Sequence, residues 1–270
     1  MAPSLTPHES ELLAYLDRRR LTRVTPSDAR PLLGRATYGV LSSMARKGVL
    51  DRVTQGVYII RPLRALGQPW GLSSFIAVEQ ALGETPHYIG ALAALTMHRL
   101  TDQSFSSVVD VYLAKRLRSR KMGNAMVRFH AVPDVRLQVG SSRLELEERP
   151  VWVSDPEKTL LDALDYPAPY GSLEGAVRTV DHAIAKVDAA TLVRYGLELS
   201  SVSTLQRLGV LLERHGAQAD TLKPLERRLR KTRNEPSMVS GPRVGRLNQR
   251  WRIVENDLVG GRLPETTFTT

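Results

Sequence analysis

The first sixty residues carry start and stop signals for three short helices in quick succession. Over residues 8–21 the apolar residues recur at helical spacing, with glutamates in the first turn and three arginines in the last. Thr25 and Pro26 then supply an N-cap and a proline at the first helical position, and Gly34 ends a short second helix. Residues 35–47 form the third, with one apolar stripe and an otherwise polar surface. Helices this short are stable only when they pack on one another.

A β-hairpin is predicted directly after the third helix. Residues 49–53 and 56–60 are two β-rich runs, and Gly56 supplies the positive φ that a tight turn between them needs. This order of elements predicts a winged helix-turn-helix, whose last helix enters the major groove of DNA while the hairpin lies along the backbone. A winged helix that docks a protein instead is the alternative. Gly39 costs the third helix about 1 kcal/mol relative to alanine, which indicates close approach of either a packing partner or DNA.

The predicted DNA contacts are the polar side chains of the third helix and the hairpin. Arginine bonds guanine in bidentate fashion, while serine and threonine bond a base edge or a phosphate. The predicted residues are Arg35, Thr37, Tyr38, Ser42, Ser43, Arg46, Lys47, Arg52, Thr54 and Gln55.

The formal net charge of +10 is concentrated at the two ends of the chain. Residues 1–66 hold 11 basic and 5 acidic residues, residues 67–222 hold 16 and 18, and residues 223–270 hold 11 and 5. Two basic ends favour a polyanionic partner. An arginine excess that serves only solubility is the alternative.

A second, larger domain is predicted after the breaker-rich stretch between Arg61 and Gly71. We therefore expect an α+β protein, with a winged helix-turn-helix in residues 1–66 and a mixed α/β domain in residues 67–270. In the second domain the periodicity predicts helices at 73–82 and 88–99, strands at 108–113, 126–130, 144–146 and 151–153, and helices from Pro156 to about Leu229.

Two further basic segments lie in this second domain. Residues 115–121 (KRLRSRK) place five basic residues in a predicted loop, and the tail interleaves arginines with Trp251, which suits backbone contact and base stacking. A solvated loop, and a basic helix packed on acidic groups of this protein or of a partner, are the alternatives. The predicted backbone contacts are Arg116, Arg118, Arg120, Arg246, Arg250 and Arg252.

Enzymatic chemistry is not indicated by the sequence. The chain has no cysteine, no glycine-rich phosphate loop and no histidine pair at metal-binding spacing. Asp110, Glu145 and Glu147 on predicted strands leave a metal-dependent nuclease as a minor alternative. We expect no catalytic residue, metal or cofactor. No apolar stretch is long enough to span a membrane and no signal peptide is evident, so a cytoplasmic protein without membrane contact is expected.

Asp155 and Pro156 predict the start of a helix, with an N-cap followed by a proline at the first position. Glu157, Lys158 and Asp162 are helical neighbours, and a solvated face is the favoured interpretation over a functional site.

Three separated blocks of sequence also occur in a characteristic order. They are LSSMARKGVLDRV ending in GVY over residues 41–58, YIG through HRLTDQ over residues 88–103, and DPEKTLLD over residues 155–162. Together these blocks resemble AbiEi-type antitoxins, the regulatory halves of abortive-infection toxin–antitoxin pairs, over residues 8–215. The resemblance implies that the winged helix binds the repeat-containing promoter of its own operon as a transcriptional repressor. It also implies that the C-terminal domain counteracts a nucleotidyltransferase toxin, directly or indirectly. A stand-alone winged-helix transcriptional regulator without a toxin partner is the alternative.

Overall fold

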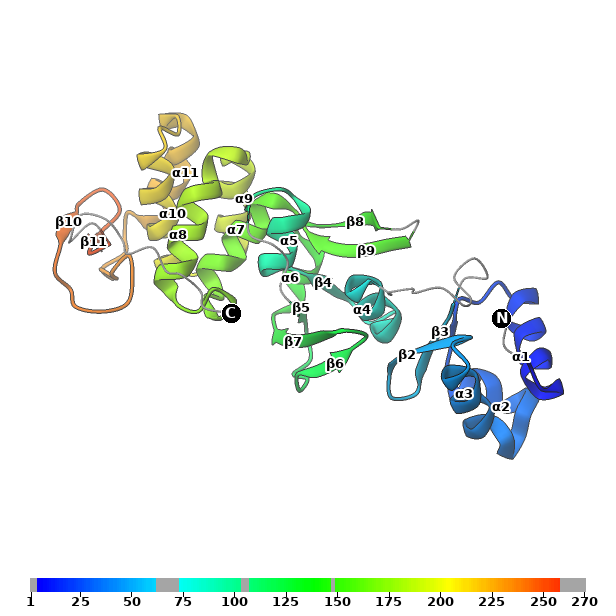
Figure 1. The fold of residues 1–270 in the computed structure, drawn as a ribbon. Helices are drawn as coiled ribbons and strands as arrows, with labels where there is room; N and C mark the ends of the chain where they lie inside the picture. Colours follow the sequence, from blue (N-terminus) through cyan, green and yellow to red (C-terminus); the bar gives the residue numbers. More distant parts are fainter. Residues whose placement is uncertain (1–3, 62–72, 103–106, 147–148, 258–270) are drawn as a thin grey trace. The chain divides into compact units, whose positions relative to one another are not determined.

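The computed structural model describes residues 4–61, 73–102, 107–146 and 149–257 (Figure 1). By its internal contacts the chain divides into two compact units. Unit 1 comprises Met1–Ile89, Ser106–Ala131 and Arg143–Trp152, and unit 2 comprises Gly90–Phe105, Val132–Ser142 and Val153–Thr270. The domain boundary predicted between residues 66 and 67 lies outside the described residues. The fold is α+β, as expected.

Unit 1 begins with the winged helix-turn-helix. Its elements are α1 (Pro7–Arg18), β1 (Arg23–Val24), α2 (Pro26–Leu33), the 3-10 turn Gly34–Ala36, α3 (Thr37–Arg46), β2 (Leu50–Thr54) and β3 (Val57–Ile60). The three strands pair in the order β1-β3-β2, and α1, α2 and α3 lie beside them (Figure 1). Only β1 was not predicted, because two residues carry no periodicity.

Local signals account for the ends of these elements. Thr6 and Thr25 cap α1 and α2, and each forms a capping box with the acidic residue three positions later. Gly56 adopts φ +75° in the hairpin turn. Leu12, Leu16, Leu41 and other apolar side chains are buried in one small core that holds the helices against the strands.

A six-stranded mixed sheet follows, and most of its residues belong to unit 1. It comprises β4 (His87–Ile89), β5 (Val108–Leu113), β6 (Arg120–Met122), β7 (Ala125–Ala131), β8 (Ser141–Leu146) and β9 (Arg149–Ser154), and α4 (Ser74–Leu82) precedes it in the chain. The strand order is β6-β7-β5-β4-β9-β8. β5 and β7 are parallel, while β4–β5 and β6–β7 are antiparallel. The helix predicted at 88–99 is wrong at its start, because β4 and α5 (Ala91–Met97) occupy this stretch. A short buried apolar run does not distinguish a strand from a helix.

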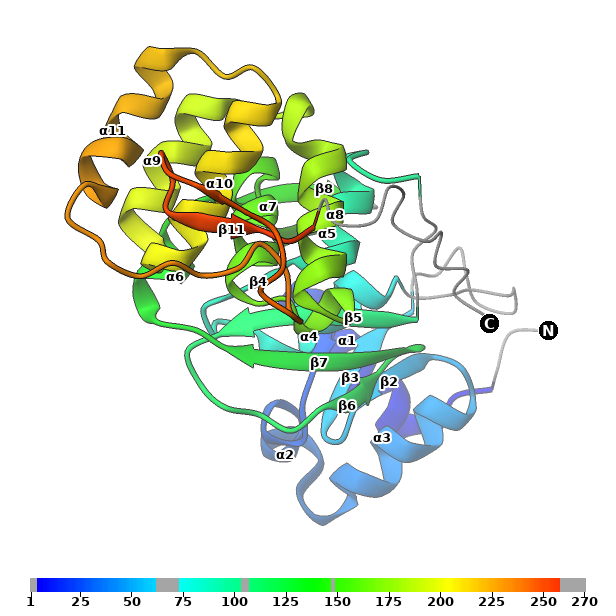
Figure 2. The same cartoon turned by 90° about the vertical axis from the view of Figure 1, so that its left-hand side faces the viewer.

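Unit 2 is predominantly helical. It contains α5, α6 (Asp134–Gln138), α7 (Pro156–Asp165), α8 (Leu173–Ala183), α9 (Ala189–Leu199), α10 (Val202–Arg214) and α11 (Ala219–Leu229), followed by a small hairpin of β10 (Arg246–Asn248) and β11 (Ile253–Glu255). The helices α7 to α11 pack together, and β11 lies against them (Figure 2). One apolar cluster extends from Ala91 to Ile253 and forms the core of this unit.

Trp251 belongs to that core and is fully buried. Its indole N–H donates to Glu213 at 2.7 Å, and its ring lies against Gly209 of α10, where an added Cβ would fall 2.3 Å from a ring carbon. The base stacking predicted for Trp251 is therefore wrong. The sequence pattern of arginines around a tryptophan does not reveal a glycine on a distant helix that provides the space for the ring.

Gly209→Ala is expected to destabilise the protein by about 1–3 kcal/mol, because the methyl group overpacks the contact with Trp251. Gly39→Ala is the matched control, since it places the same methyl group on a helix where no described atom outside the local helix backbone lies within 4 Å. Urea unfolding followed by circular dichroism measures both changes. Equal free energies of unfolding for the two variants would contradict the tight contact.

Candidate nucleic-acid interface

Four of the predicted contact residues form one exposed stripe at the start of and along α3. Arg35 lies in the turn before the helix, and Tyr38, Ser42 and Arg46 follow at intervals of three, four and four residues, which places them on the same helical face. All four are exposed. Tyr38 is 61% exposed, and Arg30 of α2 donates to its hydroxyl at 3.4 Å. The stripe thus presents two guanidinium groups, a serine hydroxyl and an aromatic ring to the solvent.

Gly39 lies between Tyr38 and Ser42 on this exposed face. Apart from its chain neighbours and the backbone of its own helix, no described atom comes within 4 Å of the position that its Cβ would take. Packing within the protein therefore gives no reason for a glycine, although glycine weakens a helix by about 1 kcal/mol. Of the two interpretations that the sequence leaves open, a packing partner is not found among the described residues.

Three other predicted contacts in α3 are engaged inside the protein. Thr37 is buried, and its hydroxyl donates to the Gly34 carbonyl at 2.7 Å. Lys47 contacts Glu9 of α1 at 2.6 Å and the Ser4 carbonyl at 2.9 Å. Ser43 lies half-buried near the same carboxyl. The prediction of DNA contacts for Thr37, Ser43 and Lys47 is corrected accordingly.

The pair between Glu9 and Lys47 holds α1 against α3. Glu9 is 1% exposed, and its carboxylate also accepts from the Thr6 N–H at 2.7 Å. Burial opposes ionisation of this carboxyl, but Lys47, the Thr6 N–H and the Ser43 hydroxyl together hold its pKa at about 2. The ion pair thereby fixes the helix that carries the exposed stripe.

The hairpin presents a second polar edge. Arg52 on β2 and Gln55 in the turn are exposed, and Thr54 is half-buried. The strand register shifts between Arg52 and Thr54, and such an irregularity increases the local twist of a hairpin. These three residues remain candidate contacts.

The predicted backbone contacts outside the winged helix divide into two groups. Arg116, Arg118 and Arg120 are exposed and belong to unit 1. They lie before and in β6, a strand that the sequence analysis did not predict in this basic segment. Arg246 is exposed on β10 of unit 2.

Arg250 and Arg252 belong to the second group and are used within unit 2. Arg250 pairs with Glu226 at 2.5 Å and with Glu213, and Arg252 pairs with Glu235 at 2.9 Å. Packing on acidic groups of the protein, one of the stated alternatives, describes these two arginines. The side chains are nevertheless 38% and 42% exposed, so their backbone contacts stay a prediction.

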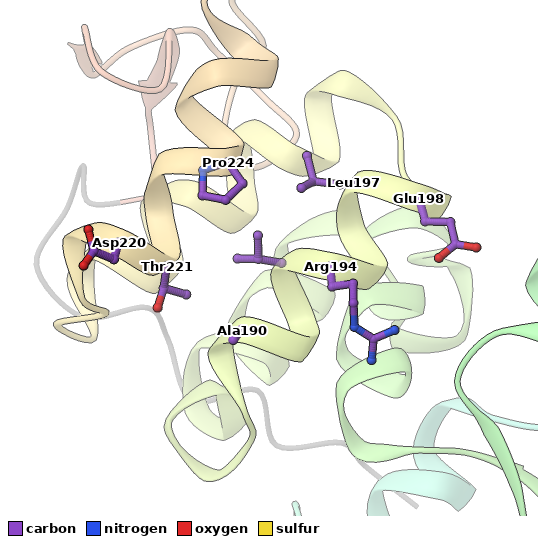
Figure 3. A pocket seen from close by; sticks show the side chains of 8 residues that line it. Ala190, Arg194, Leu197, Glu198, Asp220, Thr221 and Pro224 are labelled. Carbon is purple, nitrogen blue, oxygen red and sulfur yellow. The ribbon is translucent and has the colours of Figure 1, made fainter.

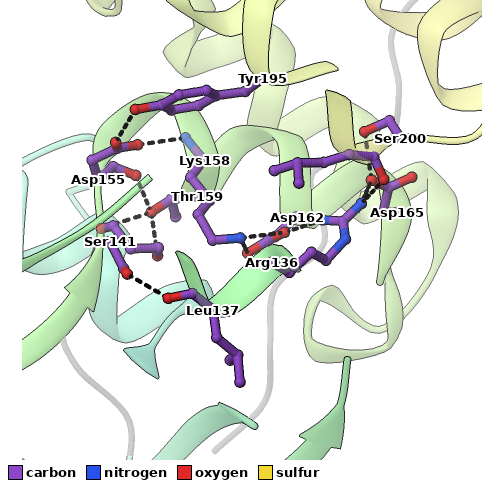
Figure 4. Close-up of polar contacts among 12 residues, drawn as sticks. Arg136, Leu137, Ser141, Asp155, Lys158, Thr159, Asp162, Asp165, Tyr195 and Ser200 are labelled. Atoms are coloured by element: carbon purple, nitrogen blue, oxygen red, sulfur yellow. Dashed lines mark hydrogen bonds and ion pairs between the residues drawn. The ribbon is translucent and has the colours of Figure 1, made fainter. Parts of the chain in front are cut away.

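A buried charged network lies in unit 2 around α7 (Figure 4). Lys158 is 0% and Asp162 1% exposed, so the prediction of a solvated face for these two residues is wrong. The Lys158 ammonium lies 3.2 Å from Asp162, and the guanidinium of Arg136 from α6 bridges Asp162 and Asp165. Arg136 precedes α7 by twenty residues, so no local spacing indicates the partner.

The groups of this network satisfy one another. Asp165 accepts from Ser200 and Thr204 at 2.6 Å, and Tyr195 donates to the N-cap Asp155 at 2.8 Å. Burial lowers the pKa of Lys158 and raises that of Asp155. Removing one member of such a buried set leaves an uncompensated charge and costs about 3–5 kcal/mol. The network is suited to holding α6, α7, α9 and α10 together.

The carboxylates of the nuclease alternative are not brought together. Both oxygens of Asp110 on β5 are occupied by Arg128 at 2.9 and 2.8 Å, and His130 lies 2.7 Å from one of them. Glu145 is exposed on β8, and β4 and β9 separate the two strands. Three strand spacings amount to about 14 Å, too far for one metal ion. Glu147 lies outside the described residues. Within the described ranges, no three acidic or histidine side chains cluster as metal ligands.

An open groove of about 630 Å³ lies between α9 and α11 of unit 2 (Figure 3). Val193, Leu197 and Pro224 line it, with Arg194 and Asp220 among the charged residues of its lining. This mixture offers apolar contact area but no converging polar groups that would orient a small ligand.

Among the helices that the structure describes, none is long and apolar enough to cross a membrane.

Comparisons with known proteins show the fold alone. No family model matches the chain, and no curated protein matches it. Among solved structures, the RV2827C protein from Mycobacterium tuberculosis is similar, with a TM-score of 0.63 and 18% sequence identity over 94% of this chain and 92% of that chain. The likeness therefore extends over nearly the full length of both chains.

Glu9→Gln is expected to destabilise α1 and α3 at neutral pH by up to roughly 3 kcal/mol, because the lowered pKa of Glu9 favours the folded state. This stabilisation is complete above the ordinary carboxyl pKa of 4.5 and is lost as the pH falls towards 2. Hydrogen exchange of amides in α1 and α3 between neutral and acid pH measures it. Glu11→Gln, at an exposed position of the same helix, is the control. A difference between wild type and Glu9→Gln that stays constant down to the acid limit would contradict this role.

Proposed function

We propose that this chain is a sequence-reading DNA-binding regulator that acts through α3 of its winged helix-turn-helix. The observation that carries the proposal is the exposed stripe of Arg35, Tyr38, Ser42 and Arg46 around the open position Gly39. Its two guanidinium groups and its serine hydroxyl are the donors that base edges and phosphates accept.

The chemistry of the stripe fits the major groove. Arginine donates to guanine O6 and N7 in bidentate fashion, and serine bonds either a base edge or a phosphate. A glycine at the centre of the stripe allows the helix backbone to come close to the groove floor. Arg52 and Gln55 on the hairpin are placed to bind the backbone beside the site, as wings do in this class of domain.

Arg46→Ala is expected to weaken the specific promoter complex by about 1–3 kcal/mol relative to random duplex, because it removes a base contact. Gly39→Ala is expected to stabilise the free protein by about 0.5–1 kcal/mol and to weaken DNA binding, because the methyl group occupies the approach surface. Arg52→Ala is expected to lower the affinity for the promoter and for the random duplex equally. Fluorescence anisotropy with the chain's own promoter and with random DNA measures all three changes.

Arg18→Ala is the matched control for this experiment, since it removes the same charge from the exposed end of α1. It is expected to leave the ratio of the two affinities unchanged. Equal losses on both duplexes for Arg46→Ala, or unaltered binding by Gly39→Ala, would remove α3 as the reading surface.

We further propose that the chain is the antitoxin of a toxin–antitoxin pair and not an enzyme. The resemblance of its three sequence blocks to AbiEi-type antitoxins supports this, and so does a unit 2 with its own core. On this proposal the protein represses its own operon in the cytoplasm and counteracts a nucleotidyltransferase toxin. A regulator without a toxin partner remains the second candidate.

Co-expression with the toxin encoded beside it, from an unrelated promoter, is expected to restore growth in cells that the toxin alone arrests. Arg46→Ala is expected to rescue as well as wild type, because neutralisation does not need promoter binding under these conditions. Colony counts after induction measure the rescue. Growth arrest that persists in the presence of the wild-type protein would leave the stand-alone regulator as the function.

A further inference from the structure

A basic arm, residues 115–121 of unit 1, remains outside the winged helix and is not explained by the fold. It carries Lys115, Arg116, Arg118, Arg120 and Lys121, and every one of its seven residues is exposed. Of the five cations, only Arg120 has an internal contact within the described parts of the chain, where its guanidinium lies 5.6 Å from the Phe129 ring centre. None of the ion pairs found among the described residues involves these five cations. Five uncompensated like charges in seven residues repel one another, so the arm favours an anionic partner.

The arm is fixed to the wing of the winged helix. It leads into β6, which pairs with β7 through Lys121 opposite Met126 and Met122 opposite Ala125. In the turn between these strands Gly123 adopts φ +56°, and its N–H donates to the carbonyl of Val53 on β2 at 3.0 Å. The wing strand and the β6–β7 hairpin lie side by side in both views (Figures 1 and 2).

Val53 is the neighbour of the candidate wing contacts Arg52 and Thr54. Gly123, which bonds Val53, is therefore held within about 7 Å of the wing tip, since a strand advances about 3.3 Å per residue. Arg120 lies on β6, three residues before Gly123 and at most about 10 Å from it. The wing of a winged helix lies along the DNA backbone. The arm is thus attached at the part of the domain that faces phosphates.

We propose that the basic arm is a second backbone-binding element, which contacts phosphates flanking the site read by α3. This inference rests on the proposed DNA-binding function and extends it to the segment before β6. Phosphate contacts suit exposed, unpaired arginines and do not depend on base sequence. A protein partner fits less well, because it would not account for the attachment of the arm to the wing strand, which lies along phosphates in this class of domain. The arm contributes affinity and register, while α3 supplies the sequence preference.

The test compares the full-length protein with the variant Arg116→Gln/Arg118→Gln/Arg120→Gln. Affinity for the promoter fragment and for random duplex of equal length is measured by anisotropy between about 50 and 200 mM salt. Each lost phosphate contact lowers the slope of log K against log salt by about 0.9, so three lost contacts lower it by about 2.7. We expect this decrease on both duplexes, with an unchanged ratio of the two affinities. All three positions are exposed, so the variant is expected to fold, and circular dichroism checks this.

Two matched variants identify the source of the effect. Arg116→Lys/Arg118→Lys/Arg120→Lys keeps the three charges and is expected to keep the slope. Arg227→Gln/Arg228→Gln/Arg230→Gln removes the same charge from exposed positions of unit 2 and is expected to leave the slope unchanged. A slope that changes by less than about one unit in the arm variant, or equally in the α11 variant, overturns the inference. If the slope changes by less than about one unit, we assign the arm to binding an acidic protein instead.

The outcomes for the arm and for α3 are distinguishable. If Arg46→Ala loses promoter preference while the arm variant keeps its salt slope, the DNA-binding proposal stands and the arm proposal falls. If the wild-type protein binds neither duplex, the DNA-binding proposal and the arm proposal are both wrong.

Discussion

A buried carboxylate in each unit requires a cation from a distant part of the sequence, and this requirement determines which helices pack together. In unit 1, Glu9 meets Lys47 and joins α1 to α3. In unit 2, Asp162 meets Lys158 and Arg136 and joins α6 to α7. An isolated charge in a protein interior is costly, so each of these carboxylates is compatible only with the arrangement that supplies its partner. The orientation of α3, and with it the exposed stripe, follows from the first of these pairs.

The parts of the fold that depend on neighbouring residues could be predicted from the sequence. Thr25 with Pro26 marked the start of α2, Gly56 the hairpin turn, and Asp155 with Pro156 the start of α7. These signals act over three or four residues, where spacing alone determines the geometry. The strand β4 was missed because three buried residues directly before a helix have no period of their own.

Whether a single charged side chain is exposed or buried could not be predicted in the same way. Arg46 and Lys47 are adjacent, yet Arg46 faces solvent while Lys47 pairs with a residue of α1. Lys158 and Trp251 were assigned to the surface or to a ligand, and both are fully buried. In each case the deciding neighbour, such as Arg136 or Gly209, lies far away in the sequence. The third helix could therefore be predicted as an element, whereas the exposure of its individual side chains could not.

The three-part composition of unit 1 has a consequence for its biosynthesis. The unit draws on residues 1–89, 106–131 and 143–152, with segments of unit 2 between them. When only the winged helix has emerged from the ribosome, the nascent chain still lacks the β6–β7 hairpin that bonds Val53. At about 5–20 residues per second, the ribosome needs roughly ten seconds or more to supply residue 152. A fragment released early, by a premature stop or by a protease, thus contains α3 and the wing without the rest of its unit. A complete unit 1 therefore exists only after more than half of the chain has been made.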